Sequence, residues 1–304
     1  MSLKKSLGKI FPVIDSNQRK KMIEDSILNG KQSNNGVVNV HRYTLGNVGD
    51  LYAGPHHYFD ELKGKQVDIL GFRKISKKKR LDWISKINDN ALVIGGGGLL
   101  NIRHFERQMK LFEELKAKGK KTVIWGAGHN QRDLSKYQNN TVYNINPSNF
   151  GIVGTRDYSA KTEWVPCVSC LHPIFDRKFT VNKEVGVIYC NKTSKRKDLL
   201  QYFKDFPSTS NTTDLEEMVN FIGSSDTIIT DSYHAMYWGI LLNKKTVVIP
   251  TTSKFYDFKY KSVISDYENY REDIKKAQRY SGVLEECREI NRNFATKVFD
   301  YLNI

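Results

Sequence analysis

The segment TDSYHAMYWG at residues 230–239 places polar side chains where a predicted strand gives way to a predicted helix. Histidine is the side chain that changes protonation most readily near neutral pH, so His234 is a candidate for donating a proton to a substrate. The positive end of a helix disfavours the imidazolium form, and the neighbouring carboxylate of Asp231 would favour it. Ser232 lies two residues before His234 and is expected to face the same ligand.

Three glycine-rich turns follow predicted strands in the first half of the chain: GNVGD at residues 46–50, GGGGLLN at residues 95–101 and GAGHN at residues 126–130. Glycine lets a ligand approach the backbone closely, and the free N–H groups that begin a helix attract anions. The first turn lacks the Gly-Lys-Ser/Thr ending of a Walker motif. Together the turns predict a surface that binds an anionic substrate through their backbone N–H groups, with these candidate site residues: Asn47, Asp50, Gly96, Gly97, Gly98, Asn101, Gly126 and His129.

A cationic side chain follows the next predicted strand, in GTRDYS at residues 154–159. Arg156 can bind a carboxylate or a phosphate through two N–H groups at once. An ion pair between Arg156 and Asp157, or a helix cap made by Asp157, is an equally weighted alternative. Farther along the chain, Lys254 and Lys259 would add positive charge to the same region, with solvated surface as their alternative role.

Two groups of residues match metal sites only in part. His56 and His57 are adjacent, so on a helix they would point in different directions. Cys167, Cys170 and His172 supply half of a zinc site, and no second pair follows at zinc-ligand spacing. The sequence therefore predicts no metal site and no cofactor.

The elements that position these residues alternate between apolar strands and amphipathic helices. In the first half, strands are predicted at residues 37–42, 67–72, 91–94, 122–125 and 150–153, and helices at residues 51–62, 81–87, 104–118 and 134–138. In the second half, strands are predicted at residues 185–190, 227–230 and 246–249, and helices at residues 214–222, 269–280 and 283–301. Asp214 is the expected N-cap of its helix.

This alternation predicts an α/β protein whose parallel sheets are covered on both faces. A break near residues 166–184, with prolines and weak periodicity, divides the chain into two Rossmann-like domains that face each other across a cleft. We expect these domains at residues 1–170 and 171–304, with the C-terminal helices able to pack back on the first. Ligands bind beyond the carboxyl ends of parallel strands, where the candidate residues lie.

The charge of the chain narrows the class of ligand. Its 304 residues include 48 Lys and Arg against 33 Asp and Glu, a net charge of +15, which attracts polyanions. The basic runs at residues 77–80 and 192–197 hold few aromatic residues that could stack on bases, which argues against nucleic acid.

No apolar run approaches the roughly 20 residues of a membrane span, and no signal peptide is recognisable. With four scattered cysteines, we expect a cytoplasmic protein whose charge also suits contact with an anionic inner membrane face.

In order along the chain, GNVGD, LVIGGGGLLN, VIWGAGHN, GTRDYSAK and TDSYHAMYWGILLNKKTVVIP resemble the polysaccharide pyruvyl transferase family, over residues 37–250. The resemblance implies a fold similar to that of the B-type glycosyltransferases. It also implies transfer of the pyruvyl group of phosphoenolpyruvate to two hydroxyls of a sugar, as a cyclic ketal, in cell-surface or exopolysaccharide biosynthesis. In this family Arg156 would hold the donor and His234 would donate the proton. Ser232 stands where many members have arginine, although a Ser-aromatic-His-Gly variant also occurs.

If the resemblance holds, Asn47 and Asp50 would orient the sugar acceptor, with Asp50 as the base, and Lys254 would add charge around the donor. The acceptor would be a lipid-linked or nucleotide-linked sugar. One alternative is a B-type glycosyltransferase that uses a nucleotide-sugar, which the serine at position 232 favours. Another is a non-catalytic relative that binds a sugar or a phosphate, against which the retained polar residues at the strand ends argue.

Overall fold

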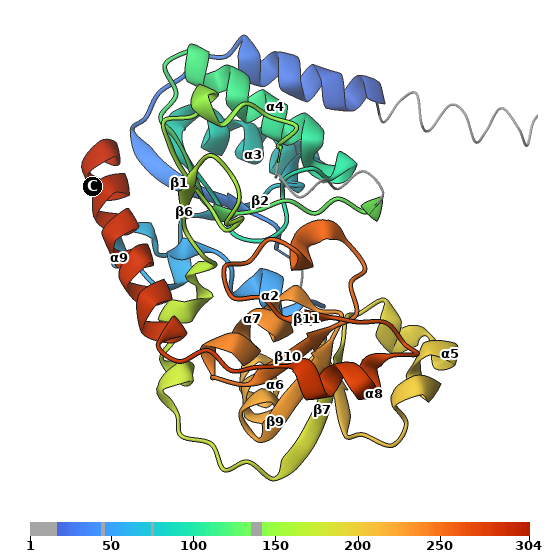
Figure 1. Ribbon diagram of the computed structural model, residues 1–304. Helices are drawn as coiled ribbons and strands as arrows, with labels where there is room; N and C mark the ends of the chain where they lie inside the picture. Colours follow the sequence, from blue (N-terminus) through green and yellow to red (C-terminus); the bar gives the residue numbers. More distant parts are fainter. Residues whose placement is uncertain (1–16, 44–45, 74–75, 135–141) are drawn as a thin grey trace, which may run out of the picture.

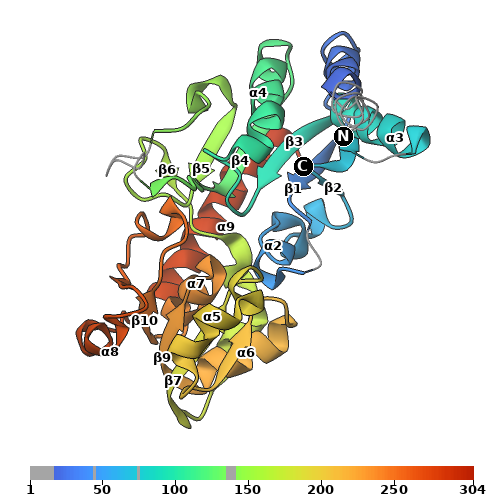
Figure 2. The same ribbon diagram turned by 90° about the vertical axis from the view of Figure 1, so that its right-hand side faces the viewer.

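Two β-sheets, each built from parallel strands, organise the chain, and helices cover both (Figures 1 and 2). This arrangement comes from a computed structural model that describes residues 17–43, 46–73, 76–134 and 142–304. It confirms the predicted α/β class with parallel sheets. Among the described residues, no helix combines the length and the apolar character that crossing a bilayer demands.

The first sheet has the strand order β2-β1-β3-β4-β5-β6. Its strands are β1 (Gly36–His41), β2 (Gln66–Asp68), β3 (Asn90–Gly95), β4 (Thr122–Ala127), β5 (Ile152–Thr155) and β6 (Glu163–Trp164). Successive residues of a strand point to opposite faces. On one face Leu92 and Ile94 pack against the helix at residues 17–28 and against α3 (Lys77–Asp89) and α4 (Arg103–Ala117).

The opposite face of this sheet packs against the last helix of the chain, α9 (Val283–Leu302). Val93 and Trp125 lie on that face, in one buried cluster with Phe294 and Val298 of α9. In Figure 1, α9 runs along the edge of the molecule from the lower half to the upper half. The chain therefore ends on the sheet in which it began.

The second sheet has the order β11-β10-β9-β7-β8. Its strands are β7 (Lys183–Tyr189), β8 (Ser208–Ser210), β9 (Ser225–Thr230), β10 (Lys245–Val248) and β11 (Val263–Ile264). One face packs on α6 (Leu215–Gly223) and α7 (Tyr233–Leu241), and the other packs near α5 (Lys197–Leu200) and α8 (Tyr270–Asp273). Asp214 caps α6 as predicted, because its side chain accepts a hydrogen bond from the Glu217 N–H at 2.8 Å.

Short helical turns replace one predicted helix. Residues 51–62 form the end of α2 (Val48–Leu51) and two 3₁₀ turns, η1 (Pro55–His57) and η2 (Asp60–Leu62), so the prediction of one continuous helix is wrong. Proline has no N–H to donate and restricts the residue before it to extended geometry, which Gly54 adopts. The other 3₁₀ turns that lie wholly within the described residues are η3 (Gly71–Arg73), η5 (Pro147–Asn149), η6 (Val168–Leu171), η7 (Pro173–Asp176), η8 (Thr193–Lys195), η9 (Gln201–Phe203), η10 (Ser253–Phe255) and η11 (Ile274–Lys276).

Two more predicted elements are shorter than expected. The strand predicted at residues 67–72 ends at Asp68, whose side chain accepts a hydrogen bond from the Leu70 N–H at 2.8 Å and turns the chain. The helix predicted at residues 269–280 is divided into α8 and η11, after which Ala277 is extended. All but the first residue of the helix predicted at residues 134–138 lies outside the described part of the chain.

Candidate functional site

A cavity of about 850 Å³ lies at the carboxyl ends of the strands of both sheets. Residues that follow β1, β3, β4 and β5 line it from the first sheet, and residues that follow β7, β8, β9 and β10 line it from the second. The ends of parallel strands are where α/β proteins bind their ligands. The cavity is therefore the candidate functional site.

Most of the residues singled out in the sequence reach this cavity. Nine of the twelve line its wall: Asn47, Asp50, Gly96, Gly97, Gly98, Arg156, Ser232, His234 and Lys254. Their segments are far apart in the sequence, and the two sheets bring them together.

Asn101, Gly126 and His129 do not line the cavity. The Asn101 side chain holds a neighbouring segment, because its Oδ1 accepts a hydrogen bond from the Asn144 N–H at 2.8 Å. Gly126 has φ +65° and lies against the backbone of Pro166, so its role is close packing. Asn101 instead lines a neighbouring pocket, together with Ile102, His104 and Arg132.

Arg156 is the most unusual side chain of the wall. It is 1% exposed, and its Cζ lies 3.8 Å from the centre of the Tyr233 ring. Its Nε and Nη2 atoms have no hydrogen-bond partner within the described residues. A buried guanidinium that keeps N–H groups unused is suited to a planar anion such as a carboxylate or a phosphate.

The ion pair that was considered for Arg156 and Asp157 is absent from the described residues. Asp157 instead accepts hydrogen bonds from the His129 N–H at 2.7 Å and from the Tyr143 hydroxyl at 2.9 Å. Burial is the main cause that raises the pKa of Asp157 to about 7, and the charge of Arg156 opposes it. Asp157 thus ties loops of the first sheet together and leaves the Arg156 guanidinium facing the cavity.

His234 lies in the first turn of α7 and is 6% exposed. Its Nε2 is 3.5 Å from the Cys167 sulfur. Burial lowers the pKa of His234 well below its usual value, and the charges of Arg156 and Lys254 lower it further. The free protein therefore holds a neutral imidazole at neutral pH.

The expectation that Asp231 supports a protonated His234 is wrong. The Asp231 carboxylate accepts hydrogen bonds from the Cys190 N–H and from the Thr193 hydroxyl. These contacts fix the loop after β7. Any stabilisation of the imidazolium must then come from a ligand in the cavity.

Asp50 belongs to a chain of polar contacts that joins the two sheets. The Asn47 Nδ2 donates to its carboxylate at 2.9 Å, and the Asn211 Nδ2 donates to the Asn47 Oδ1 at 3.2 Å. Burial raises the pKa of Asp50, while Lys254 and Arg156 lower it. A carboxylate with a raised pKa is a stronger base than a free one.

The turn after β3 lines the cavity with three successive glycines, Gly96, Gly97 and Gly98. Gly96 and Gly97 have φ +74° and +80°, a conformation that side chains other than glycine rarely adopt. No described residue accepts a hydrogen bond from the N–H of Gly97 or Gly98. Successive N–H groups in such a turn form a concave site for an anion.

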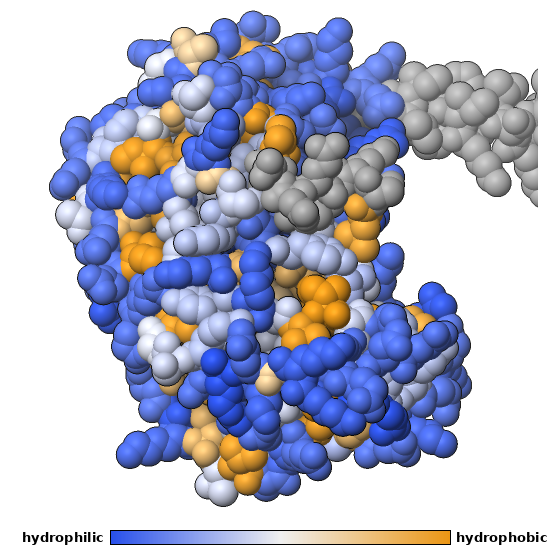
Figure 3. Space-filling view, in the orientation of Figure 1, coloured by the Kyte–Doolittle hydropathy of each residue, from blue (hydrophilic) through white to orange (hydrophobic). Residues whose placement is uncertain are grey.

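Sequence reasoning missed four cations of the cavity wall: Arg42, Arg132, Lys192 and Arg196. Arg42 follows β1 directly and Arg132 lies five residues after β4, whereas Lys192 and Arg196 belong to the basic run at residues 192–197; these positions were the available signal. Asp50 is the only acidic residue among the described residues that line the cavity. The cavity is strongly positive and fits an anionic ligand. Outside it, the face in Figure 3 is largely hydrophilic.

Gly49 lets α2 approach α7 closely. A Cβ atom at position 49 would lie 2.1 Å from the His234 Nδ1 and 2.6 Å from the His234 Cβ. We expect Gly49→Ala to push the helices apart and to lower the free energy of unfolding by about 1–3 kcal/mol, as overpacking does. Denaturant unfolding measures this loss.

Gly239→Ala is the matched control, because position 239 lies in the same α7 but faces Thr246 at 3.0 Å rather than the cavity. This variant should lose less stability than Gly49→Ala. Equal losses would mean that the approach of α2 to α7 carries no special constraint.

The remaining predicted residues have structural surroundings. Lys259 pairs with Glu286, so it does not contribute to the cavity. The His57 Nε2 lies 2.7 Å from the Leu51 carbonyl oxygen. The Cys170 sulfur lies 3.5 Å from the Asn291 amide, and the His172 Nδ1 accepts from the Ile174 N–H at 3.1 Å.

Comparison with known proteins assigns this chain to a family. No curated protein matches the chain. A solved structure of a functionally uncharacterised protein from Klebsiella pneumoniae is 15% identical, with a TM-score of 0.41 over 77% of this chain and 89% of that one. The family model of the polysaccharide pyruvyl transferases matches residues 45–253, which run from the first glycine-rich turn to the loop after β10. The match covers more than half of the sequence, and the chain belongs to the polysaccharide pyruvyl transferase family.

Proposed function

We propose that this protein transfers the pyruvyl group of phosphoenolpyruvate to two hydroxyls of a sugar, forming a cyclic ketal and releasing phosphate. The observation that carries the proposal is the buried Arg156, whose Nε and Nη2 are unused by the described residues. Its guanidinium lines the same cavity as Lys254 and His234. Cationic groups and an imidazole at one site suit a highly charged donor that must be protonated.

The donor carries a carboxylate and a phosphate, and the cavity offers two kinds of partner for them. Arg156 presents a planar fork for one anionic group. The N–H groups of Gly97 and Gly98 and the ammonium of Lys254 suit the other. We also propose that the two sheets belong to Rossmann-like domains, residues 1–170 and 171–304 with the C-terminal helix α9 packed back on the first, and that these domains close on the donor as in the B-type glycosyltransferases.

The chemistry assigns one role to each polar side chain. His234 gives a proton to the methylene carbon of the donor, and a sugar hydroxyl attacks the neighbouring carbon, which becomes cationic. Loss of phosphate then lets the second hydroxyl close the ketal. Of the two hydroxyl protons released, one replaces the proton that His234 gave and one leaves with phosphate.

Asp50 is the proposed base for the attacking hydroxyl, because burial raises its pKa and Asn47 fixes its orientation. Cys167 positions the acid, because its sulfur lies 3.5 Å from the His234 Nε2.

The neutral His234 of the free protein predicts that donor binding takes up a proton. Arg156 and Lys254 help to lower the pKa of His234, and a bound trianion would offset both charges. The pKa of the imidazole then rises, so the complex holds more protons than the free protein and donor affinity falls as pH increases. Calorimetry between pH 7.5 and 8.5, in buffers of different ionisation enthalpy, measures this uptake.

Lys254 is the other group in the cavity that could take up the proton, because burial and the charge of Arg156 lower its pKa as well. His234→Gln removes the imidazole and leaves Lys254 in place, so it shows which of the two groups is protonated. The variant should keep donor binding but lose most of the proton uptake. If the wild type binds the donor without taking up a proton, His234 is not the group that is charged in the complex.

Ligand binding tests the proposal. Thermal shifts with phosphoenolpyruvate, phosphate, UDP and CMP should be compared for the wild type and for Arg156→Ala. A shift with phosphoenolpyruvate well beyond that with phosphate, and lost in the variant, is the expected result. A shift with phosphate equal to that with phosphoenolpyruvate would contradict recognition of the pyruvyl donor.

A second candidate function is transfer of a sugar from a nucleotide-sugar. Ser232 at the cavity wall and the cations on the side of the second sheet, Lys192 and Arg196, favour this candidate because they suit a diphosphate. A thermal shift with UDP or CMP, without a shift with phosphoenolpyruvate, would select it. Binding without turnover of either donor would indicate a non-catalytic sugar- or phosphate-binding relative.

The acceptor is proposed to be a lipid-linked or nucleotide-linked sugar of a cell-surface polysaccharide. The net charge of +15 suits work in the cytoplasm near an anionic membrane face, where a lipid-linked acceptor would lie. No metal or redox cofactor has a role in the proposed steps.

A further inference from the structure

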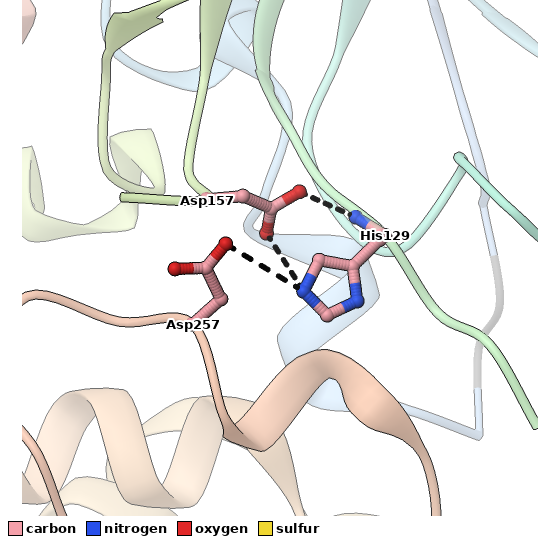
Figure 4. A group of neighbouring side chains, drawn as sticks. All are labelled: His129, Asp157 and Asp257. Atoms are coloured by element: carbon pink, nitrogen blue, oxygen red, sulfur yellow. Dashed lines mark hydrogen bonds and ion pairs between the residues drawn. The ribbon is translucent and has the colours of Figure 1, made fainter. Parts of the chain in front are cut away.

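Three buried side chains outside the cavity converge on one point (Figure 4). The carboxylates of Asp157 and Asp257 approach the His129 Nε2 to 3.7 Å and 4.0 Å. His129 follows β4 and Asp157 follows β5, whereas Asp257 lies in the segment after β10. They are 1%, 2% and 4% exposed, so none of the three is solvated as a surface group would be.

We propose that the His129 Nε2, an oxygen of Asp157 and an oxygen of Asp257 bind one divalent transition-metal ion, Zn²⁺ or Mn²⁺. The ion would tie the segment that carries Lys254 to the first sheet. It would be structural, because none of its three ligands lines the cavity.

The distances suit a metal site better than a network of hydrogen bonds. At 3.7 Å and 4.0 Å, the carboxylate oxygens are too far from the Nε2 for a hydrogen bond. Around a tetrahedral ion with bonds of about 2.1 Å, ligand atoms lie about 3.4 Å apart. The three ligand atoms lie within 4.8 Å of one another, so a small inward movement of each would close the site.

The charge balance also favours a cation. The carboxylates of Asp157 and Asp257 are both buried, and buried carboxylates are common ligands of metal ions. A divalent ion would neutralise both carboxylates at once.

Hydrogen bonds from neighbouring residues hold each proposed ligand in place, as hydrogen bonds do around the ligands of known metal sites. The His129 Nδ1 lies 2.6 Å from the Ser253 hydroxyl, which turns the Nε2 toward the carboxylates. Asp157 is held by its bonds from the His129 N–H and Tyr143, and Asp257 accepts from the Ser159 N–H and hydroxyl at 2.9 Å and 2.7 Å. The orientation of the site is therefore already fixed.

The ligand types select the class of ion. One imidazole and two carboxylates, without a thiolate, suit Zn²⁺ and Mn²⁺. Mg²⁺ and Ca²⁺ prefer sites made of oxygen atoms alone.

Metal binding to the whole protein tests the proposal. Tag-free protein is stripped with a chelator and dialysed against Zn²⁺ or Mn²⁺, and bound metal is measured by mass spectrometry, without donor or acceptor. We expect one ion per chain and a higher melting temperature. A stripped wild type that binds neither ion would overturn the proposal.

Variants assign the ion to these ligands. Asp257→Asn can still accept the hydrogen bonds from Ser159, and His129→Gln keeps a polar side chain, so circular dichroism should show a native fold with at least tenfold weaker metal binding. His57→Gln removes an imidazole outside this cluster, and it should bind metal like the wild type. Unchanged binding in both ligand variants would place the ion elsewhere.

Binding of Co²⁺ to the wild-type protein is a test that does not require any variant to fold. Co²⁺ bound to the wild type should produce visible absorption bands that Zn²⁺ abolishes by competition. The absence of bands at stoichiometric Co²⁺ would contradict binding by an imidazole and carboxylates in a closed site.

Discussion

Replacement of His234 by glutamine is expected to lower turnover about a hundredfold or more while the fold survives, which is the usual cost of removing a general acid. Glutamine is neutral and polar, so it can remain beside the Cys167 sulfur, which lies 3.5 Å from the imidazole. It cannot give a proton to carbon. Release of phosphate from phosphoenolpyruvate with a saturating sugar acceptor measures the loss, and circular dichroism verifies the fold.

His57→Gln is the matched control for this experiment. His57 contacts the Leu51 carbonyl and does not line the cavity, so its loss should leave turnover close to the wild-type value. Near-normal activity of His234→Gln would remove the imidazole from the mechanism and move attention to Lys254 as the acid.

Replacement of Arg156 by lysine is expected to raise the KM for the donor about ten- to a hundredfold and to change kcat less. Lysine keeps the positive charge but loses the planar fork and the contact with the Tyr233 ring. Hydrogen bonds to charged groups contribute about 1.5–3 kcal/mol, which corresponds to this range of affinity. Steady-state kinetics with varied donor measures the effect.

Arg288→Lys is the corresponding control. Arg288 is a structural arginine that donates to the Cys170 carbonyl at 2.9 Å and pairs with Asp176 at 2.6 Å. It should lower the melting temperature and leave the KM for the donor unchanged. The same pattern in Arg156→Lys, with lower stability and an unchanged KM, would mean that Arg156 only packs the loop.

The position of the cavity could be predicted from the sequence because parallel strands end at one edge of a sheet. Glycine-rich turns after apolar segments mark those ends, and they correctly indicate Gly97, Arg156 and His234 as residues of the wall. A strand end does not fix where each side chain points. For this reason Asn101 and His129 were expected at the cavity but do not line it.

The strength of local periodicity decided which elements could be predicted. The helix predicted at residues 283–301 corresponds to α9, whose apolar residues recur along one face. Residues 51–62 also alternate apolar and polar side chains, but the Gly54–Pro55 pair interrupts the helix. The approach of Asp257 to His129 has no signal in spacing, because 128 positions separate them and only the packed fold brings them together.

Because α9 packs on the first sheet, the half that carries the second sheet is topologically an insertion. The chain leaves the first sheet after β6 and returns to it through α9, where Phe294 and Val298 join the cluster of Val93 and Trp125. A single cut near residue 170 would strip the first sheet of the helix that covers one of its faces. Excising the inserted half would require two cuts, one before β7 and one near the start of α9, followed by a short linker. To produce either half alone, the chain must therefore be cut at both of these boundaries.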